Sequence, residues 1–157
     1  MRVGWGFDTH RFGGDGSTVL GGVVVDPGRG VVATSDGDVL AHAACDALLG
    51  AAALGDLGAM FPSSDPRWEG ADSMSLLATV VARVHAAGLR VSSVDATILA
   101  ERVRIAPHRD TIRRHLAGVL HLAESSLSVK ATSTDGLGFV GRDEGLAAVV
   151  VAVLSEG

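Results

Sequence analysis

The chain has 157 residues, of which 47% are apolar, and a formal net charge of −5. This length is typical of one domain that buries about 70% of its unfolded surface, so we expect a single domain over residues 1–157. The absence of a Lys or Arg cluster argues against nucleic acid as a partner. The longest apolar run, Leu146–Leu154, is much shorter than the roughly 20 residues of a membrane-spanning helix, so we expect no membrane partner.

A single cysteine, Cys45, lies on the apolar side of a predicted helix. One cysteine cannot form an internal disulfide, so we interpret it as a core residue in a reducing compartment. Near the N-terminus, Asp8, His10 and Arg11 interrupt any apolar stretch that could serve as a secretory signal. These features favour a cytoplasmic protein.

The first predicted element is a strand over Arg2–Phe12, which is rich in Val, Phe and Trp. After a glycine-rich loop, Val19–Val24 predicts a hairpin with Gly21 and Gly22 as its two-residue turn. A second turn is expected over Asp26–Gly30.

A long helix is predicted over Asp38–Leu54, which contains no proline and only one glycine. Asp36 or Ser35 can cap its start, and Gly55 can end it. Asp38, His42 and Asp46 follow at i, i+4 and i+8 and therefore share one face of the helix. A polar stripe on an otherwise apolar helix indicates a site.

After this helix, residues 56–70 predict a long polar loop, and loops of this length are usually functional or disordered. The remaining predicted elements are a helix, a strand, a helix and two strands: Ser73–Ala87, Val91–Glu101, a helix from Pro107, Leu127–Thr132 and Gly145–Leu154. This order favours an α+β two-layer domain, with one mixed β-sheet and helices on one face. The last strand is apolar on both faces, which indicates oligomerisation through the sheet.

The N-terminal strand and the long helix together suggest a metal site. Asp8 and His10 are two residues apart, so in a strand their side chains point to the same side. With His42 they form an Asp-His-His set, and three such ligands with an open fourth position are typical of catalytic zinc. The same spacing also fits a surface histidine with a salt bridge on a helix face, so spacing alone leaves both interpretations open.

Residues 136–141 match the pattern G-x-G-x-x-G. A dinucleotide-binding loop would open a helix and be followed by an acidic residue about 20 positions later. Here a strand-like segment follows, so we reject a dinucleotide site. These glycines instead let the backbone turn or approach another group closely.

Several blocks together resemble the 2-C-methyl-D-erythritol 2,4-cyclodiphosphate synthase family of the non-mevalonate isoprenoid pathway. The blocks are GFDTHRF (6–12), SDGDVLAHAACDALLGAAALGDLG (35–58), FPSSDP (61–66), GADS (70–73) and KATSTDGLGFVGRDEG (130–145). The resemblance implies cyclisation of 4-diphosphocytidyl-2-C-methyl-D-erythritol 2-phosphate, in which the 2-phosphate attacks the β-phosphorus and CMP leaves. It further implies one Zn²⁺ per chain on Asp8, His10 and His42, and Mg²⁺ or Mn²⁺ on Asp135.

The resemblance also assigns substrate contacts. The erythritol would be bound by Ser35, Asp56, Leu57 and Gly58 and covered by Phe61, Pro62, Ser63, Ser64 and Asp65. The cytosine would be held by Ala100, Glu101, Arg102, Val103, Arg104 and Ile105. The diphosphate would contact Thr132 and Ser133, and Thr34 and Ser133 occupy the two catalytic positions. Asp38 and Asp46 would orient His42 or the neighbouring loop, although Asp38 also fits simple compensation of the helix dipole.

Relatives of this family form homotrimers whose active sites lie between chains and whose apolar axial cavity can take an isoprenoid diphosphate. Phe7, Phe139 and Arg142 match positions near that cavity. Thr34 departs from the family pattern, which has histidine there, as do Ser133 in place of Thr and Val103-Arg104 in place of Pro-Lys. Two alternatives therefore stay open: a catalytically weak trimeric paralogue that binds an isoprenoid diphosphate as a regulatory module, and a zinc phosphohydrolase.

Overall fold

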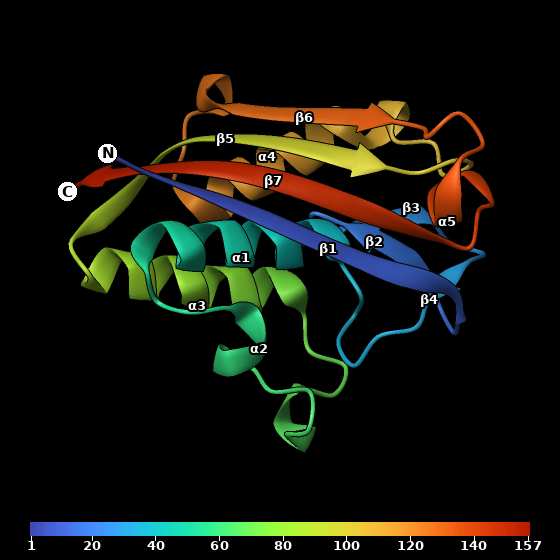
Figure 1. Ribbon diagram of the computed structural model, residues 1–157, viewed down its shortest axis with the longest axis horizontal. Helices are drawn as coiled ribbons and strands as arrows, with labels where there is room; N and C mark the ends of the chain where they lie inside the picture. Colours follow the sequence, from blue (N-terminus) through green and yellow to red (C-terminus); the bar gives the residue numbers. More distant parts are fainter.

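The computed structural model describes residues 1–157 and places five strands in one sheet (Figure 1). The strand order is β4-β1-β7-β5-β6. The strands span, in chain order, β1 Arg2–Gly14, β4 Gly30–Val31, β5 Leu89–Leu99, β6 Leu127–Thr132 and β7 Gly145–Glu156. The pair β5–β6 is parallel and the other neighbouring pairs are antiparallel. The prediction of a mixed sheet is confirmed.

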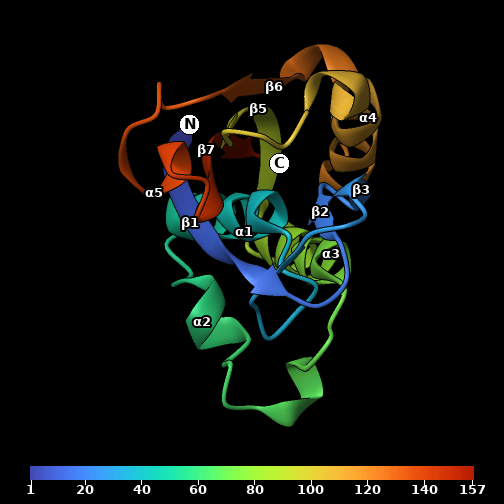
Figure 2. The ribbon, with the colours of Figure 1, turned by 90° about the vertical axis from the view of Figure 1, so that its right-hand side faces the viewer.

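Three longer helices lie on one side of this sheet, α1 (Val39–Ala52), α3 (Ser73–Ala86) and α4 (Arg109–Leu120) (Figures 1 and 2). The α+β two-layer arrangement is thus confirmed. Shorter helical turns are α2, α5 and three 3₁₀ segments: Leu57–Met60, Gly138–Gly141, Pro66–Trp68, Ala106–His108 and Glu124–Ser126. None of the helices has the length and apolar character needed to cross a membrane.

Two glycines allow α1 to lie directly on β1. A Cβ added to Gly6 would come within 2.0 Å of the Ala43 carbonyl oxygen, and one added to Gly4 within 1.9 Å of the Ala47 carbonyl oxygen. Any side chain at these positions would therefore push the helix away from the strand. Gly4 and Gly6 share a strand face with Asp8 and His10, so the same close packing sets the distance between these residues and α1.

The face of β1 and β7 that points away from α1 carries apolar side chains that no other part of the chain covers. Val3, Trp5 and Phe7 are 64%, 62% and 42% exposed. Their antiparallel partners on β7 are Val153, Val151 and Val149, each of which is only partly buried. Directly paired residues project to the same face of a sheet, so these six side chains form a continuous apolar strip, called here the outer strip.

The predicted hairpin with Gly21 and Gly22 between its strands is confirmed, and some sequence-based boundaries elsewhere were wrong. The hairpin of β2 (Thr18–Leu20) and β3 (Val23–Asp26) forms a separate two-stranded sheet. Helix α1 starts after Asp38, whose carboxylate accepts hydrogen bonds from the Leu40 and Ala41 amides. The helix ends before Gly55, because Ala53 already adopts the left-handed conformation, with φ of 57°. The predicted loop over residues 56–70 contains α2 and a 3₁₀ turn, each begun by an aspartate cap.

Candidate active site

The structure brings together the three side chains that the sequence suggested as metal ligands. Asp8 and His10 come from β1 and His42 from the first turns of α1. Asp8 Oδ2 lies 2.9 Å from His42 Nδ1 and 3.3 Å from His10 Nε2. His10 Nε2 lies 3.2 Å from His42 Nδ1. One carboxylate oxygen and two imidazole nitrogens therefore form a compact triangle.

The size of this triangle suits a metal ion. Ligand atoms about 2.0–2.1 Å from a tetrahedral zinc lie roughly 3.3 Å apart, close to the three distances observed. Burial lowers the pKa of His10 despite the opposing charge of Asp8, and a neutral imidazole is the form that binds metals. The three residues can therefore hold a metal ion and leave one side open for another ligand.

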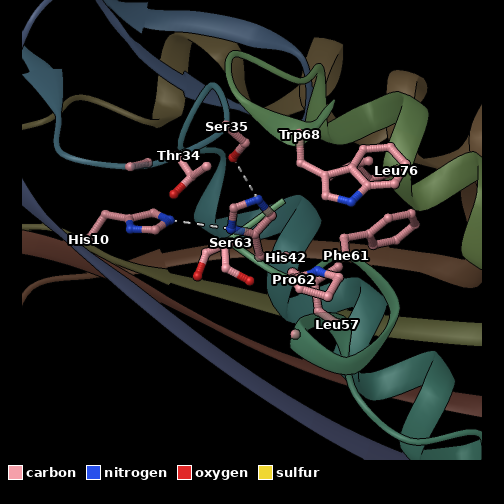
Figure 3. A pocket seen from close by; sticks show the side chains of 13 residues that line it. His10, Thr34, Ser35, His42, Leu57, Phe61, Pro62, Ser63, Trp68 and Leu76 are labelled. Atoms are coloured by element: carbon pink, nitrogen blue, oxygen red, sulfur yellow. Dashed lines mark hydrogen bonds between the residues drawn. The ribbon is translucent and has the colours of Figure 1, made fainter. Parts of the chain in front are cut away.

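A pocket opens beside this triangle, and its two walls differ in chemistry (Figure 3). One wall carries polar groups of His10, Thr34, Ser35 and Ser63. The other wall is formed by apolar side chains, namely Leu57, Phe61, Pro62, Trp68 and Leu76. Ala33, His42, Gly58 and Ser64 complete the lining. Such a pocket fits a small ligand with phosphate and hydroxyl groups on one side and carbon atoms on the other.

The loop that carries Thr34 and Ser35 is held from two sides. The Gly70 amide donates to the Thr34 carbonyl oxygen at 2.8 Å, and the Asp36 amide donates to the Ala71 carbonyl oxygen at 3.0 Å. Gly37 follows with a φ of 73°, which a side chain rarely adopts. The loop therefore presents Thr34 and Ser35 to the pocket from a fixed backbone.

Asp38 and Asp46 were expected to orient His42 or the neighbouring loop, and the structure shows contacts with the helix start and the loop rather than with the His42 ring. Asp38 is fully buried, caps α1 and accepts a hydrogen bond from the Gly22 amide at 2.9 Å. Burial raises the pKa of Asp38 to about 6. Asp46 accepts a hydrogen bond from the Leu57 amide at 2.7 Å, which fixes the start of α2. Asp38 joins the hairpin to α1, and Asp46 orients the pocket loop rather than His42.

Asp56 and Asp65 also act locally within this structure. Asp56 caps α2 through the Ala59 amide at 2.7 Å. Asp65 caps the 3₁₀ turn and pairs with Arg67. Both carboxylates shape the segment over the pocket, and neither lines it.

A second group of predicted residues lies elsewhere, at the carboxyl ends of β5 and β6. The Ala100 amide donates to the Thr132 carbonyl oxygen at 3.1 Å, so the two segments that follow these strands start side by side. None of this group lines the pocket beside His42: Ala100–Ile105, Thr132, Ser133, Asp135, Phe139 and Arg142. Within one chain, the predicted site residues therefore form two separate sets, one around the pocket beside His42 and one after β5 and β6.

Sequence reasoning missed three residues at the pocket. Trp68 packs edge-on against Phe61, with 4.9 Å between the ring centroids, and its buried indole N–H has no acceptor within the chain. Leu76 of α3 completes the apolar wall. Ser73, fully buried, lies 2.9 Å from His42 Nε2. The GADS block pointed to this region, but no spacing rule connects Ser73 with His42.

Comparison with known proteins agrees with this geometry. The sequence model of the YgbB family matches residues 1–155. A 2-C-methyl-D-erythritol 2,4-cyclodiphosphate synthase of Pseudomonas aeruginosa strain UCBPP-PA14 is 54% identical, over 98% of each chain. A solved synthase described as a bound form with CDP is 31% identical, with a TM-score of 0.89, over 98% of this chain and all of that one.

A larger protein contains the same fold as one part of its chain. The bifunctional IspDF of Campylobacter jejuni is 38% identical and superimposes with a TM-score of 0.96. The match covers 99% of the present chain and 42% of the bifunctional one. The fold described here therefore occurs both as a chain of this length and within a longer one.

Proposed function

Because the chain belongs to the YgbB family, whose curated relatives are named 2-C-methyl-D-erythritol 2,4-cyclodiphosphate synthase, we infer that it catalyses this cyclisation. It is a lyase that converts 4-diphosphocytidyl-2-C-methyl-D-erythritol 2-phosphate into the 2,4-cyclodiphosphate. An oxygen of the 2-phosphate bonds to the β-phosphorus, and the bond from that phosphorus to the α-phosphate oxygen breaks to release CMP. The observation that carries this inference is the Asp8, His10 and His42 triangle at the mouth of a two-sided pocket.

The pocket matches the erythritol part of this substrate. The polar wall with Thr34, Ser35 and Ser63 suits hydroxyl and phosphate oxygens, and the wall with Phe61 and Trp68 suits the carbon skeleton and its methyl group. The buried Trp68 N–H has no acceptor within the chain, and an oxygen atom of the substrate could accept its hydrogen bond. Holding the chain of the substrate in a bent pose brings nucleophile and phosphorus together, and well-oriented intramolecular reactions reach effective molarities of about 10⁵ M or more.

We propose Zn²⁺ at Asp8, His10 and His42, one per chain, because the donor set and spacing fit it. Asp135 would hold Mg²⁺ or Mn²⁺. Bound at these places, the ions supply positive charge that offsets repulsion between the phosphates and polarises the phosphorus under attack. The protein's part is to fix the three zinc ligands and the phosphate-facing loop in advance.

A homotrimer would unite the two separate sets of site residues. The outer strip gives each chain an apolar surface that a second copy can cover. In such an assembly, Ala100–Ile105 and Thr132–Asp135 of one chain would face the zinc ligands of the next and bind the cytidine and diphosphate. Phe139 and Arg142 would lie near the axis, where an isoprenoid diphosphate could bind. Light scattering should give three times the mass of the chain.

Thr34 provides a prediction about rate. It lines the pocket from a fixed backbone, and its hydroxyl can donate one hydrogen bond to a phosphate but carries no positive charge. Loss of one such donor from an oxyanion site costs about 10²–10³ in rate. Since threonine replaces the family's histidine in part, we expect a smaller effect than the loss of a whole donor, namely an enzyme roughly 10-fold slower than relatives with histidine.

Single-turnover kinetics check this expectation. Thr34→Ala should slow cyclisation further, and Thr34→His should accelerate it, while the zinc content of both variants stays that of the parent. Unchanged single-turnover rates in Thr34→Ala would mean that position 34 serves only the loop.

A further inference from the structure

The buried side of the His42 ring, opposite the metal-binding edge, is enclosed by hydroxyl groups. His42 is only 8% exposed, and Ser73 is fully buried. His42 Nε2 lies 2.9 Å from Ser73 Oγ and 3.1 Å from Ser35 Oγ. Ser73 comes from the first turn of α3 and is 31 residues from His42 in sequence, so this contact is created by the packing of α3 against α1.

Ser73 in turn is held by Asp36. The Ser73 hydroxyl donates a short hydrogen bond to Asp36 Oδ1. The Ser73 amide donates to Asp36 Oδ2 at 3.1 Å. Asp36 itself is fixed, because its amide donates to the Ala71 carbonyl oxygen and its Oδ1 accepts from the Asp38 amide at 3.2 Å. Both carboxylate oxygens of Asp36 therefore fix the orientation of one serine.

These contacts determine the direction of the hydrogen bonds. An ionised carboxylate only accepts, and a serine hydroxyl has one proton to donate. With that proton directed at Asp36, Ser73 Oγ can only accept from His42, so Nε2 carries the ring proton. A neutral imidazole has one N–H, and His42 Nδ1 is then left with a free lone pair, directed toward Asp8 Oδ2 and His10 Nε2.

We propose that Ser73 and Asp36 are positioning residues that keep His42 in the Nε2–H form, so that Nδ1 is ready to bind the metal. This inference rests on the zinc site proposed above. Partners of this kind, bound to the second nitrogen of a metal-binding imidazole, fix its tautomer and orientation. Here the partner is Ser73: Asp36 accepts the proton of the Ser73 hydroxyl, and the Ser73 oxygen in turn accepts the proton of His42 Nε2.

Zinc competition with a chromophoric chelator tests the proposal without using catalysis. Loss of such partners costs about 10–100-fold in metal affinity, and we expect Ser73→Ala to fall near the low end, since Ser35 can still accept from Nε2. Asp36→Asn should also weaken zinc binding, because the amide NH₂ group cannot accept a hydrogen bond and so replaces one of the two acceptors that the Ser73 amide and the Ser73 hydroxyl now use. Ser75→Ala is the matched control, since Ser75 lies two residues further along α3, is exposed, and its hydroxyl bonds only Asp72.

Nitrogen NMR of the histidine rings in the zinc-loaded protein gives a second readout that a merely structural role would not move. The parent chain should show a His42 Nε2 proton that exchanges slowly with water, because the Ser73 hydroxyl oxygen accepts it, and Ser73→Ala and Asp36→Asn should speed this exchange. Parent affinity for zinc in both variants, or an exchange rate of this proton that neither variant changes, would overturn the proposal. If His42→Ala still binds zinc like the parent, the metal site itself is wrong, which is a different failure.

Discussion

Replacing His42 by alanine is expected to remove the metal and to lower kcat by at least about 10³-fold while the fold persists. His42 supplies one corner of the triangle with Asp8 and His10. The remaining two ligands cannot complete the set of three protein ligands that catalytic zinc usually has. The charge that metal ions provide against phosphate repulsion is worth several kcal/mol in the transition state.

Metal analysis after gel filtration, together with steady-state kinetics, checks this prediction. His115→Ala is the control, because His115 is an exposed histidine of α4 outside the site. The control should retain the parent's zinc content and kcat, and circular dichroism should show that both variants are folded. Full zinc occupancy in His42→Ala would refute the assignment of His42 as a ligand.

Gly6→Ala is expected to damage both stability and activity, although Gly6 touches no substrate. The new methyl group would lie 2.0 Å from the Ala43 carbonyl oxygen and 2.7 Å from the Ala47 amide nitrogen, so α1 must move. Overpacking of this kind costs typically about 1–3 kcal/mol of unfolding free energy. Movement of α1 also separates His42 from Asp8, and a displacement of about 1 Å can cost 10²-fold in rate.

Gly50→Ala is a matched control on the same helix. Gly50 is exposed, and an added Cβ would meet nothing within 4 Å. Alanine is a better helix former than glycine, so this variant should gain about 0.5–1 kcal/mol. Urea unfolding should therefore show lower stability for Gly6→Ala and higher stability for Gly50→Ala, and kcat should fall only in Gly6→Ala. A Gly6→Ala variant as stable and active as the parent would show that α1 tolerates displacement from β1.

Local patterns predicted most of the secondary structure. The alternation around Val94, Ala96 and Ile98 gave β5, and all three side chains are buried. Helix composition likewise gave α1. Its start was placed too early because Ser, Asp and Gly at residues 35–38 offer several possible caps. Tertiary packing selects one of them. Both carboxylate oxygens of Asp36 accept hydrogen bonds from Ser73, and Asp38 caps the helix.

Contacts between distant elements could not be predicted in the same way. Asp8 and His10 share a strand face by the period of a strand, but their distance from His42 depends on Gly4 and Gly6, whose role appears only when α1 lies on them. Asp38 and Asp46 on α1 were expected to orient His42 or the neighbouring loop, and neither of them supports the His42 ring. The supports in the structure, Ser73 and Asp36, come from other segments, because the ring of His42 turns its second nitrogen toward α3.

The resemblance of sequence blocks contributed what periodicity could not. It named the reaction, and the match of the YgbB family over residues 1–155 confirms the family. It also assigned to one site two sets of residues that lie apart within a single chain, and the proposed homotrimer would bring them together. The physical basis in the chain itself is the outer strip, whose apolar side chains lack a partner.

The most direct test of the proposed reaction is phosphorus NMR of the chain incubated with 4-diphosphocytidyl-2-C-methyl-D-erythritol 2-phosphate, Zn²⁺ and Mg²⁺. Cyclisation predicts equal amounts of CMP and a cyclic diphosphate, in which both remaining phosphorus atoms belong to one ring and are coupled to each other. Attack by water instead would give CMP and two uncoupled linear phosphate monoesters. That second result, or the absence of CMP, would contradict the account.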